Sequence, residues 1–259
     1  MALDGFVISN MVHELSKNLV GGRILKISQP EKDELILTIK NYDQFKLFIS
    51  ASASLPLIYL TNNSKTNPMV APNFCMLLRK HLNSARIISI TQPEFERIIQ
   101  FEIEHLDELG DVCKKYLIVE IMGKHSNIIF CDQDYKIVDS IKHISGFVSS
   151  VREVLPGRTY FIPKTIEKLN PLTITKEEFL RLLEKPLSIS KAIYQGLTGI
   201  SPLLATEICH RASIDAEGAT AILSEDVRIH LYNVFTRVME LVINCDYSPN
   251  IVFKNEEPM

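Results

Sequence analysis

The sequence lacks the features that would assign it to several common classes of protein. It contains no tryptophan, and none of its apolar stretches approaches the roughly 18 residues that a membrane-spanning helix needs. Its five cysteines are widely spaced and form no CxxC pair, which argues against a disulfide framework and against a zinc ribbon. The amino-terminal segment carries Asp4 where a signal peptide has basic residues. We therefore expect a reduced protein of the cytoplasm without a membrane span.

An excess of positive charge is missing as well. The 28 Lys and Arg residues are outnumbered by 31 Asp and Glu residues, so the net charge is −3. This balance excludes a chain that binds nucleic acid through a uniformly basic surface, so any phosphate-binding site must be local. The length of 259 residues and the 46% content of hydrophobic residues suffice for one large folded domain or two smaller ones.

Recognisable catalytic and metal-binding motifs are also absent. The seven histidines form no HExxH motif and no cluster with metal-ligand spacing. Glu207 and His210 lie one helical turn apart, but an isolated ExxH pair needs ligands from other helices to hold a metal. No nucleophile elbow, GxGxxG loop or Cys-His signature is present. The sequence therefore predicts no catalytic residues, no metal site and no cofactor.

The first part of the chain, residues 1–164, is mainly typical of β-structure. Helical spacing occurs there only after Asp4, which stands at an N-cap position, and after Pro72. Short apolar runs are separated by turn residues, without helices between most of them, and this predicts antiparallel sheets packed as a sandwich or barrel. The runs cover residues 22–28, 34–40, 46–51, 55–60, 85–92, 96–104, 115–122, 127–132 and 136–144.

From residue 165 to residue 246 the pattern is helical. A capping box, formed by Thr175 and Glu178, predicts the start of one helix, and further helical stretches follow with short connections. The predicted fold class is therefore α+β, with an antiparallel, β-sandwich-like domain at 1–164 and an all-helical domain at 165–246. Residues 247–259 contain the start of a strand at Ile251, and we expect the sequence to be the front of a longer protein.

Acidic residues are distributed unevenly along the chain. The segment from Gln44 to Pro93 contains no Asp or Glu, whereas Arg79 and Lys80 are among its basic residues. Such a window can form a local cationic surface for phosphates. Its Lys and Arg side chains can equally do no more than solvate turns.

Two short polar motifs lie beside apolar runs. Glu96-Arg97 could bind nucleic acid, with the arginine as a fork to phosphate and the carboxylate as an acceptor, or it could be an ordinary surface pair. The residues Gly123 to Asn127 could cradle a phosphate or form a polar hairpin turn. They are not a P-loop, because the GxxxxGK[ST] spacing is missing.

Seven segments in order carry a resemblance to a known family. They are MALDGFVISNMVHEL, GGRILKISQP, NFCMLLRKHL, EFERIIQFEI, IVEIMGKHSNIIF, VREVLPGRTY and GISPLLATEICHRA. Together they resemble the N-terminal NFACT module of the RqcH/NEMF family, whose bacterial members are often named fibronectin-binding protein A. The resemblance covers nearly the whole chain, and seven motifs in register are more specific than any one of them.

The resemblance implies a ribosome-associated quality-control factor. Family members bind a large ribosomal subunit still obstructed by peptidyl-tRNA, recruit charged tRNA and promote untemplated C-terminal tailing of the stalled chain, with alanine in bacteria. Alanine tRNA is then the implied partner, and the chemistry of tailing belongs to the ribosome. The module is also implied to be similar to formamidopyrimidine-DNA glycosylase, in which a β-sandwich-like domain precedes a helix-two-turn-helix domain.

The family's functional residues carry over onto two places in this sequence. Its Asp-Gly pair matches Asp4-Gly5, and its Asp-Arg motif falls on Glu96-Arg97, so the arginine matches and the acid is longer by one methylene. The resemblance thus predicts an RNA-binding site formed by Asp4, Glu96 and Arg97. Together with nearby basic residues, these are expected to converge into one shallow cationic surface. The supporting residues are Arg79, Lys80, Lys124 and His125.

Two alternative functions remain open beside RNA binding. A DNA glycosylase or lyase of the similar fold uses an N-terminal proline amine as nucleophile and a zinc finger to grip the duplex, whereas this chain begins with Met1-Ala2 and has no zinc-finger cysteines. A surface adhesin for fibronectin or fibrinogen, which the second family name suggests, needs a route of export. The sequence shows no export signal or anchoring motif.

Overall fold

The computed structural model describes residues 3–106, 110–147, 151–162, 167–249, 253–254 and 257–258. The chain divides into two compact units, Met1–Lys168 and Leu169–Met259. The sequence places this boundary at residue 164, four residues before the division at residue 168. All of the residues predicted to bind RNA belong to the first unit.

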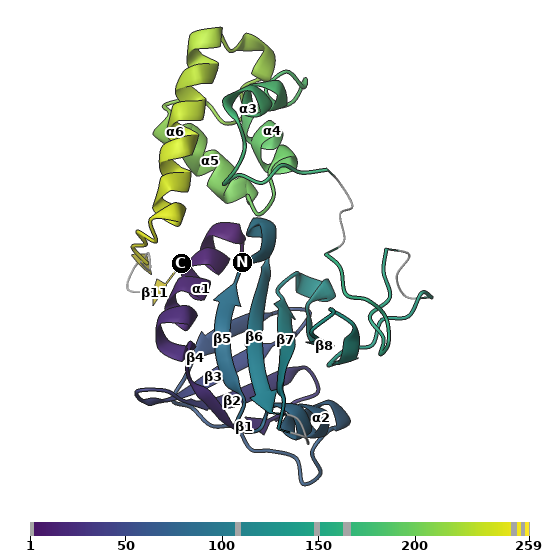
Figure 1. Ribbon diagram of the computed structural model, residues 1–259. Coiled ribbons are helices and arrows are strands. Elements are labelled where there is room, and N and C mark those ends of the chain that lie inside the picture. Colours follow the sequence, from purple (N-terminus) through teal and green to yellow (C-terminus); the bar gives the residue numbers. More distant parts are fainter. Residues whose placement is uncertain are drawn as a thin grey trace. The chain divides into compact units, whose positions relative to one another are not determined.

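One antiparallel sheet of nine strands forms the framework of the first unit (Figure 1). Its strands follow the order β4-β3-β2-β1-β5-β6-β7-β8-β9. At the centre of this order β1 meets β5 through a single residue pair, Arg23 and Arg86. The strands are β1 (Arg23–Ser28), β2 (Glu34–Lys40), β3 (Gln44–Ser50), β4 (Leu57–Leu60), β5 (Arg86–Thr91), β6 (Ile98–Leu106), β7 (Val112–Glu120), β8 (Asn127–Asp132) and β9 (Ile137–Ser140).

The two halves of the sheet enclose one hydrophobic core. Leu37 of β2 and Leu47 of β3 belong to the same buried cluster as Phe101 of β6 and Leu117 of β7. In Figure 1, β2, β3 and β4 cross behind β5, β6 and β7, because the sheet bends at the narrow β1–β5 junction. The predicted α+β class with antiparallel strands is confirmed. The expected sandwich is made from one bent sheet rather than from separate sheets.

Two helices complete this core. α1 (Gly5–Leu19) begins after Asp4, whose Oδ1 accepts a hydrogen bond from the Val7 N–H at 3.1 Å, as the cap position predicts. α2 (Asn73–Leu82) follows Pro72 and turns its apolar side chains inward. α1 contacts β5 and β6, whereas α2 contacts β1 and β6. The helices therefore cover different parts of the same sheet.

The outer face of β6, β7 and β8 carries a second, smaller core. Side chains alternate between the two faces of a strand, so Ile98, Ile118 and Ile129 point away from the main core. Val154 and Tyr160, from the segment that follows β9, belong to the same buried cluster. The start of β6 and the end of β7 are thus covered on both faces.

The second unit is helical between Lys176 and Ile243. Its helices are α3 (Lys176–Leu182), α4 (Ile189–Gly196), α5 (Pro202–Arg211), α6 (Glu225–Ile243) and the short η3 (Thr220–Ile222). The predicted capping box is present, because Glu178 N donates to Thr175 Oγ1 at 3.2 Å and Thr175 N donates to Glu178 Oε2 at 2.9 Å. The rings of Phe179 and Phe235 lie 4.7 Å apart. Assignment of these helices as a helix-two-turn-helix domain stays a prediction.

The carboxyl-terminal part forms a short hairpin. β10 (Phe253–Lys254) pairs with β11 (Glu257–Pro258) in antiparallel register. The strand start predicted at Ile251 lies outside the described residues. Among the described helices of both units, none combines the length and the apolar character that crossing a membrane requires.

Candidate nucleic-acid interface

The amino-terminal Asp-Gly pair and the Glu-Arg pair meet at one end of the sheet. η1 (Pro93–Phe95) is the short 3-10 turn that leads into β6. A Cβ atom at Gly5 would lie 2.6 Å from the backbone oxygen of Phe95 and 2.8 Å from its ring. Gln92 joins the two segments, because its Nε2 donates hydrogen bonds to Gly5 O at 2.8 Å and to Glu96 O at 2.9 Å. The start of α1 and the turn before β6 are thus held side by side.

Substitution of Gly5 tests this junction. We expect Gly5→Ala to lower the free energy of unfolding by about 1–3 kcal/mol, the usual cost of forcing an extra methyl group into a closely packed contact. The clash involves the Phe95 backbone, which cannot rotate away as a side chain can. Urea denaturation measures the effect, with Val7→Ala on the exposed side of the same helix as control. Equal stability of the two variants would show that α1 does not depend on this close approach.

The turn before β6 has an unusual backbone. Glu94 has a φ of 49° and Phe95 a φ of 61°, both in the left-handed region that side chains other than glycine avoid. Each such residue costs on the order of 1–3 kcal/mol and persists only where its surroundings enforce it. Here Phe95 is 1% exposed, so its buried ring anchors the turn. Backbone strain of this kind clusters at functional sites.

Glu96 and Arg97 form a half-buried charged group at the start of β6. Burial raises the pKa of the Glu96 carboxyl, and Arg97, through its backbone N–H and its charge, opposes that rise together with Lys168. Partial burial lowers the pKa of Lys168, against the effect of the Glu96 carboxylate. One acid therefore lies within the field of two cations. Such a group can offer an acceptor oxygen and a guanidinium fork to the same ligand.

The turn between β7 and β8 lies at the same end of the sheet. β7 runs antiparallel to β6, and Ile121 N donates to Arg97 O at 2.9 Å. η2 (Gly123–His125) follows directly, and both Lys124 and His125 are exposed. The structure thus brings these two residues to the end of the sheet that carries the Glu-Arg pair.

The backbone of this turn favours a polar hairpin over a phosphate cradle. His125 N donates to Met122 O at 3.2 Å, and Ser126 N donates to Gly123 O at 3.0 Å. Ser126 Oγ in turn accepts a hydrogen bond from Met122 N at 2.8 Å. Because the amides of Met122, His125 and Ser126 are used internally, the turn offers a ligand mainly the side chains of Lys124 and His125.

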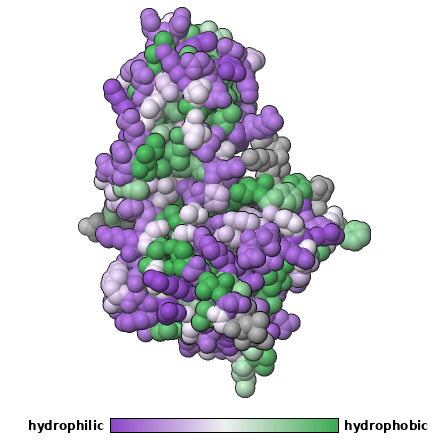
Figure 2. Space-filling model, viewed as in Figure 1, coloured by the Kyte–Doolittle hydropathy of each residue, from purple (hydrophilic) through white to green (hydrophobic). Residues whose placement is uncertain are grey.

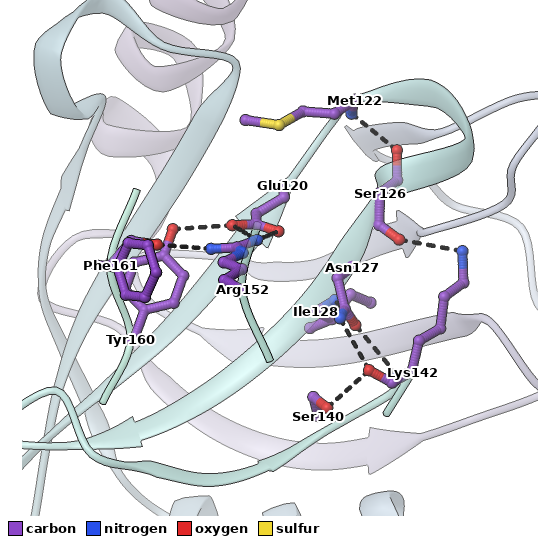
Figure 3. A network of polar contacts seen from close by, with 10 residues as sticks. All are labelled: Glu120, Met122, Ser126, Asn127, Ile128, Ser140, Lys142, Arg152, Tyr160 and Phe161. Carbon is purple, nitrogen blue, oxygen red and sulfur yellow. Dashed lines mark hydrogen bonds and ion pairs between the residues drawn. The ribbon is translucent and has the colours of Figure 1, made fainter. Parts of the chain in front are cut away.

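A network of polar contacts holds the residues that follow η2, Ser126 and Asn127, against Lys142 (Figure 3). The ammonium group of Lys142 donates to Ser126 O at 3.0 Å and to Ala51 O. Asn127 holds the Lys142 backbone from both sides, since its Oδ1 accepts from Lys142 N at 3.1 Å and its Nδ2 donates to Lys142 O at 2.9 Å. Burial lowers the pKa of Lys142. The network fixes the base of the exposed turn.

An ion pair is buried next to the Glu-Arg group. Glu120 at the end of β7 is paired in register with Ile98, the residue after Arg97. The Glu120 carboxylate is fully buried and accepts hydrogen bonds from Arg152, at 2.6 Å to Oε1, and from the Tyr160 hydroxyl at 3.0 Å. Figure 3 shows Arg152 and Tyr160 converging on Glu120 from the covering segment.

This geometry explains how the pKa values of the two partners of Glu120 are shifted. Burial, and then the Glu120 carboxylate, raises the pKa of the Tyr160 hydroxyl. For Arg152, burial alone would lower the pKa, but the charge of Glu120 outweighs it and the pKa is raised. The ion pair between Glu120 and Arg152 ties the covering segment to β7.

Arg79 and Lys80 lie at the opposite end of β6 from the Glu-Arg pair. They belong to α2, where the ring of His81 lies 6.1 Å from that of His105 near the end of β6. A strand of nine residues spans about 30 Å at roughly 3.3 Å per residue. The expected convergence into one surface is therefore wrong for Arg79 and Lys80, because α2 packs against β1 and the far end of β6.

Other basic residues of the acid-free window are engaged locally. Lys65 pairs with Glu34 of β2 at 2.7 Å, and Lys46 donates to Ser64 Oγ at 2.7 Å. Arg86 donates through its Nε to Gly21 O at 3.3 Å. The segment from Gln44 to Pro93 contains no acidic residue, but Glu34 of β2 lies close enough in space to pair with its Lys65.

Sequence reasoning missed several residues of this end of the sheet. Nothing in the sequence marks Gln92 or Lys168. The buried ion pair had a signal, because a single carboxylate, Glu120, stands within the apolar run LIVEIM, and Arg152 is the second residue of the segment VREVLPGRTY. Among the described residues, no group of three or more His, Cys, Asp or Glu is placed to hold a metal ion.

Comparison with known proteins gives a family match over almost the entire chain. The family model described as "NFACT N-terminal and middle domains" matches residues 4–259. A curated relative from Streptococcus suis (strain 05ZYH33), named "Rqc2 homolog RqcH", is 41% identical over 217 residues, which are 83% of this chain and 39% of that protein. One of the same name from Bacillus subtilis (strain 168) is 41% identical over 218 residues, 83% of this chain and 38% of that protein.

A solved structure agrees with these matches. The N-terminal part of the fibronectin/fibrinogen-binding protein from Streptococcus suis superposes with a TM-score of 0.77 and 37% identity, covering 91% of this chain and 85% of that one. The chain spans less than two fifths of the length of the curated relatives it matches, 39% and 38%. The resemblance seen in the sequence is confirmed.

Proposed function

The chain belongs to the family of NFACT N-terminal and middle domains. From this premise we propose that it is the RNA-binding module of a ribosome-associated quality-control factor. The ligands are tRNA, with alanine tRNA as the expected species, and a large ribosomal subunit obstructed by peptidyl-tRNA. The factor promotes C-terminal alanine tailing of the stalled chain. The chain contributes binding and positioning, and the ribosome forms the peptide bonds.

One observation carries this proposal. The Asp4-Gly5 start of α1 is held against the strained turn that presents Glu96 and Arg97, with Gln92 as the bridge. Two motifs distant in sequence thereby have neighbouring backbones, which supports the proposal that they share a ligand.

The chemistry of this site suits folded RNA. The guanidinium of Arg97 can form two parallel hydrogen bonds to a phosphate. Glu96 beside it can accept a hydrogen bond from a ribose 2′-hydroxyl, which is the group that distinguishes RNA from DNA. The exposed Lys124 and His125 extend the site along the sheet end and can contact neighbouring phosphates. Arg79 and Lys80 are left out of this site, because they lie beyond the other end of β6.

A binding titration distinguishes this proposal from its alternatives. The chain is titrated with alanine tRNA, with a DNA duplex of similar charge and with fibronectin, each over a range of salt concentrations. We expect tRNA to bind more tightly than the duplex and to lose affinity as salt rises, because phosphate contacts release counterions. Tighter binding of the duplex would support a DNA-binding protein related to the glycosylases.

The fibronectin arm has its own motivation. The structure from Streptococcus suis that resembles this chain is named a fibronectin/fibrinogen-binding protein. If this chain binds fibronectin and shows no affinity for tRNA, the adhesin hypothesis replaces the proposal.

A further inference from the structure

A small cavity opens beside α2, away from the candidate RNA site. It has a volume of about 110 Å³ and lies between the carboxyl end of β1 and the segment that leads into α2. Its lining residues are Gln29, Asn67, Pro68, Met69, Ala71 and Arg79. The proposed RNA-binding function uses none of them.

Gln29, which lines the cavity, has a side-chain acceptor that its surroundings leave unused. Gln29 is 4% exposed, and its Nε2 donates to Lys32 O at 3.2 Å, which sets the orientation of the amide. Its Oε1 is buried and accepts no hydrogen bond from the described residues. A buried carbonyl oxygen without a donor costs about 1–3 kcal/mol, so a ligand that supplies an N–H to Gln29 recovers that loss.

A cation stands at the same cavity. Arg79 donates through its Nε to Ile27 O at 2.8 Å, which fixes the side chain over the end of β1. Its Nη1 faces the sulfur of Met76 at 3.8 Å, and sulfur is a weak acceptor that a carboxylate readily displaces. None of the residues that line the cavity is acidic, and the window from Gln44 to Pro93 contains no acid. The charge of the site therefore favours an anionic group.

The rim of the cavity is apolar and exposed. Met69 and Val70 are 104% and 82% exposed, and Met76 on α2 is 54% exposed. Figure 2 shows hydrophobic surface at the lower edge of the view, where Figure 1 draws the segment that enters α2. Exposed methionines adapt to varied apolar partners, and exposed apolar patches mark contacts with proteins.

We propose that this cavity binds an extended, acidic and apolar segment of a partner protein. A main-chain N–H of the segment donates to Gln29 Oε1, and an Asp or Glu carboxylate pairs with the guanidinium of Arg79. An apolar side chain of the segment covers Met69 and Val70. A peptide fits better than nucleic acid, because a phosphate backbone cannot form apolar contacts with exposed Met69 and Val70. The proposal does not depend on the RNA-binding function.

Selection from a phage-displayed library of random 12-residue peptides tests the proposal on the 259-residue chain. We expect enriched peptides that carry Asp or Glu next to apolar residues. A synthetic peptide of the enriched sequence should bind Arg79→Ala about ten- to a hundredfold more weakly, as expected for a charge-assisted hydrogen bond. Lys124→Ala, at the other end of β6, should bind it as tightly as the parent.

A second variant and a spectroscopic readout distinguish loss of the peptide contact from misfolding of Arg79→Ala. Arg79 also holds the end of β1, whereas Met69 is fully exposed, so Met69→Ala should weaken peptide binding without changing the melting temperature. In NMR spectra, the side-chain amide signals of Gln29 should shift as the peptide saturates the chain. Enrichment of peptides without acidic residues, or equal affinity for the parent, Arg79→Ala and Met69→Ala, would overturn the proposal. Displacement of the peptide by a single-stranded RNA of 20 nucleotides would assign the cavity to nucleic acid.

Discussion

Replacing Arg97 by alanine is expected to weaken binding of tRNA by about tenfold to a hundredfold, because a hydrogen bond to a charged phosphate contributes roughly 1.5–3 kcal/mol. The slope of log affinity against log salt concentration should fall by about one unit for the lost phosphate contact. Filter binding at several salt concentrations measures both quantities. The melting temperature of the variant shows whether the fold is intact.

Two variants show whether geometry or charge alone carries the effect. Arg97→Lys keeps the positive charge but loses the planar fork, so its affinity should fall between those of the parent and of Arg97→Ala. Arg79→Ala removes the same charge at the far end of β6 and should leave tRNA binding unchanged. If Arg79→Ala weakens binding as much as Arg97→Ala does, binding follows total charge and the proposed local site is wrong.

Glu96→Asp is the companion to these variants. It restores the Asp-Arg pair that the family resemblance predicts at this position, and it shortens the acidic side chain by one methylene group. Because the Glu96 carboxylate is held in place beside Arg97, we expect the shorter acid to retain binding of tRNA. Loss of binding as large as that of Arg97→Ala would show that the turn before β6 is shaped for the longer acid.

Replacing Arg152 by alanine is expected to lower the free energy of unfolding by about 3–5 kcal/mol, the usual cost of removing one partner of a buried ion pair. The Glu120 side chain is fully buried and that of Arg152 is 11% exposed, so removal of the guanidinium leaves the Glu120 carboxylate buried without its charged partner. Urea denaturation at neutral pH measures the loss.

A matched arginine on the same segment provides the control. Arg158 pairs with Glu153 at 2.7 Å, but its side chain is 62% exposed, so Arg158→Ala should cost less than about 1 kcal/mol. Replacing Glu120 and Arg152 together by Gln and Met should destabilise less than Arg152→Ala alone, because no buried charge is then left without a partner. Equal losses for Arg152→Ala and Arg158→Ala would contradict the buried ion pair.

Local features of this protein follow from the sequence alone. The N-cap at Asp4 and the capping box of Thr175 and Glu178 involve hydrogen bonds within three residues, so the sequence predicts them without knowledge of the fold. The antiparallel strands follow from apolar alternation and turn residues over similarly short distances. Family membership is also a property of the sequence, because the order of seven motifs can be compared directly.

The candidate site was predicted only in part. The resemblance singled out Asp4, Glu96 and Arg97, and the fold brings the two segments together through Gln92, a residue that no motif marks. The role of these residues in RNA binding stays a prediction. The grouping of Arg79 with Arg97 failed, because closeness in sequence says nothing about which end of a strand a helix will cover.

Tertiary structure decided which charges meet and which stay apart. The register of β6 against β7 places Glu120 next to the start of β6, and the covering segment then carries Arg152 to it. Lys65 is neutralised by an acid from β2, and Gln29 is left with a buried oxygen that no described group satisfies. These outcomes depend on strand register and on contacts between residues far apart in the chain, whose free energy is set by burial and by the exclusion of water. A pattern of neighbouring residues contains no information about either.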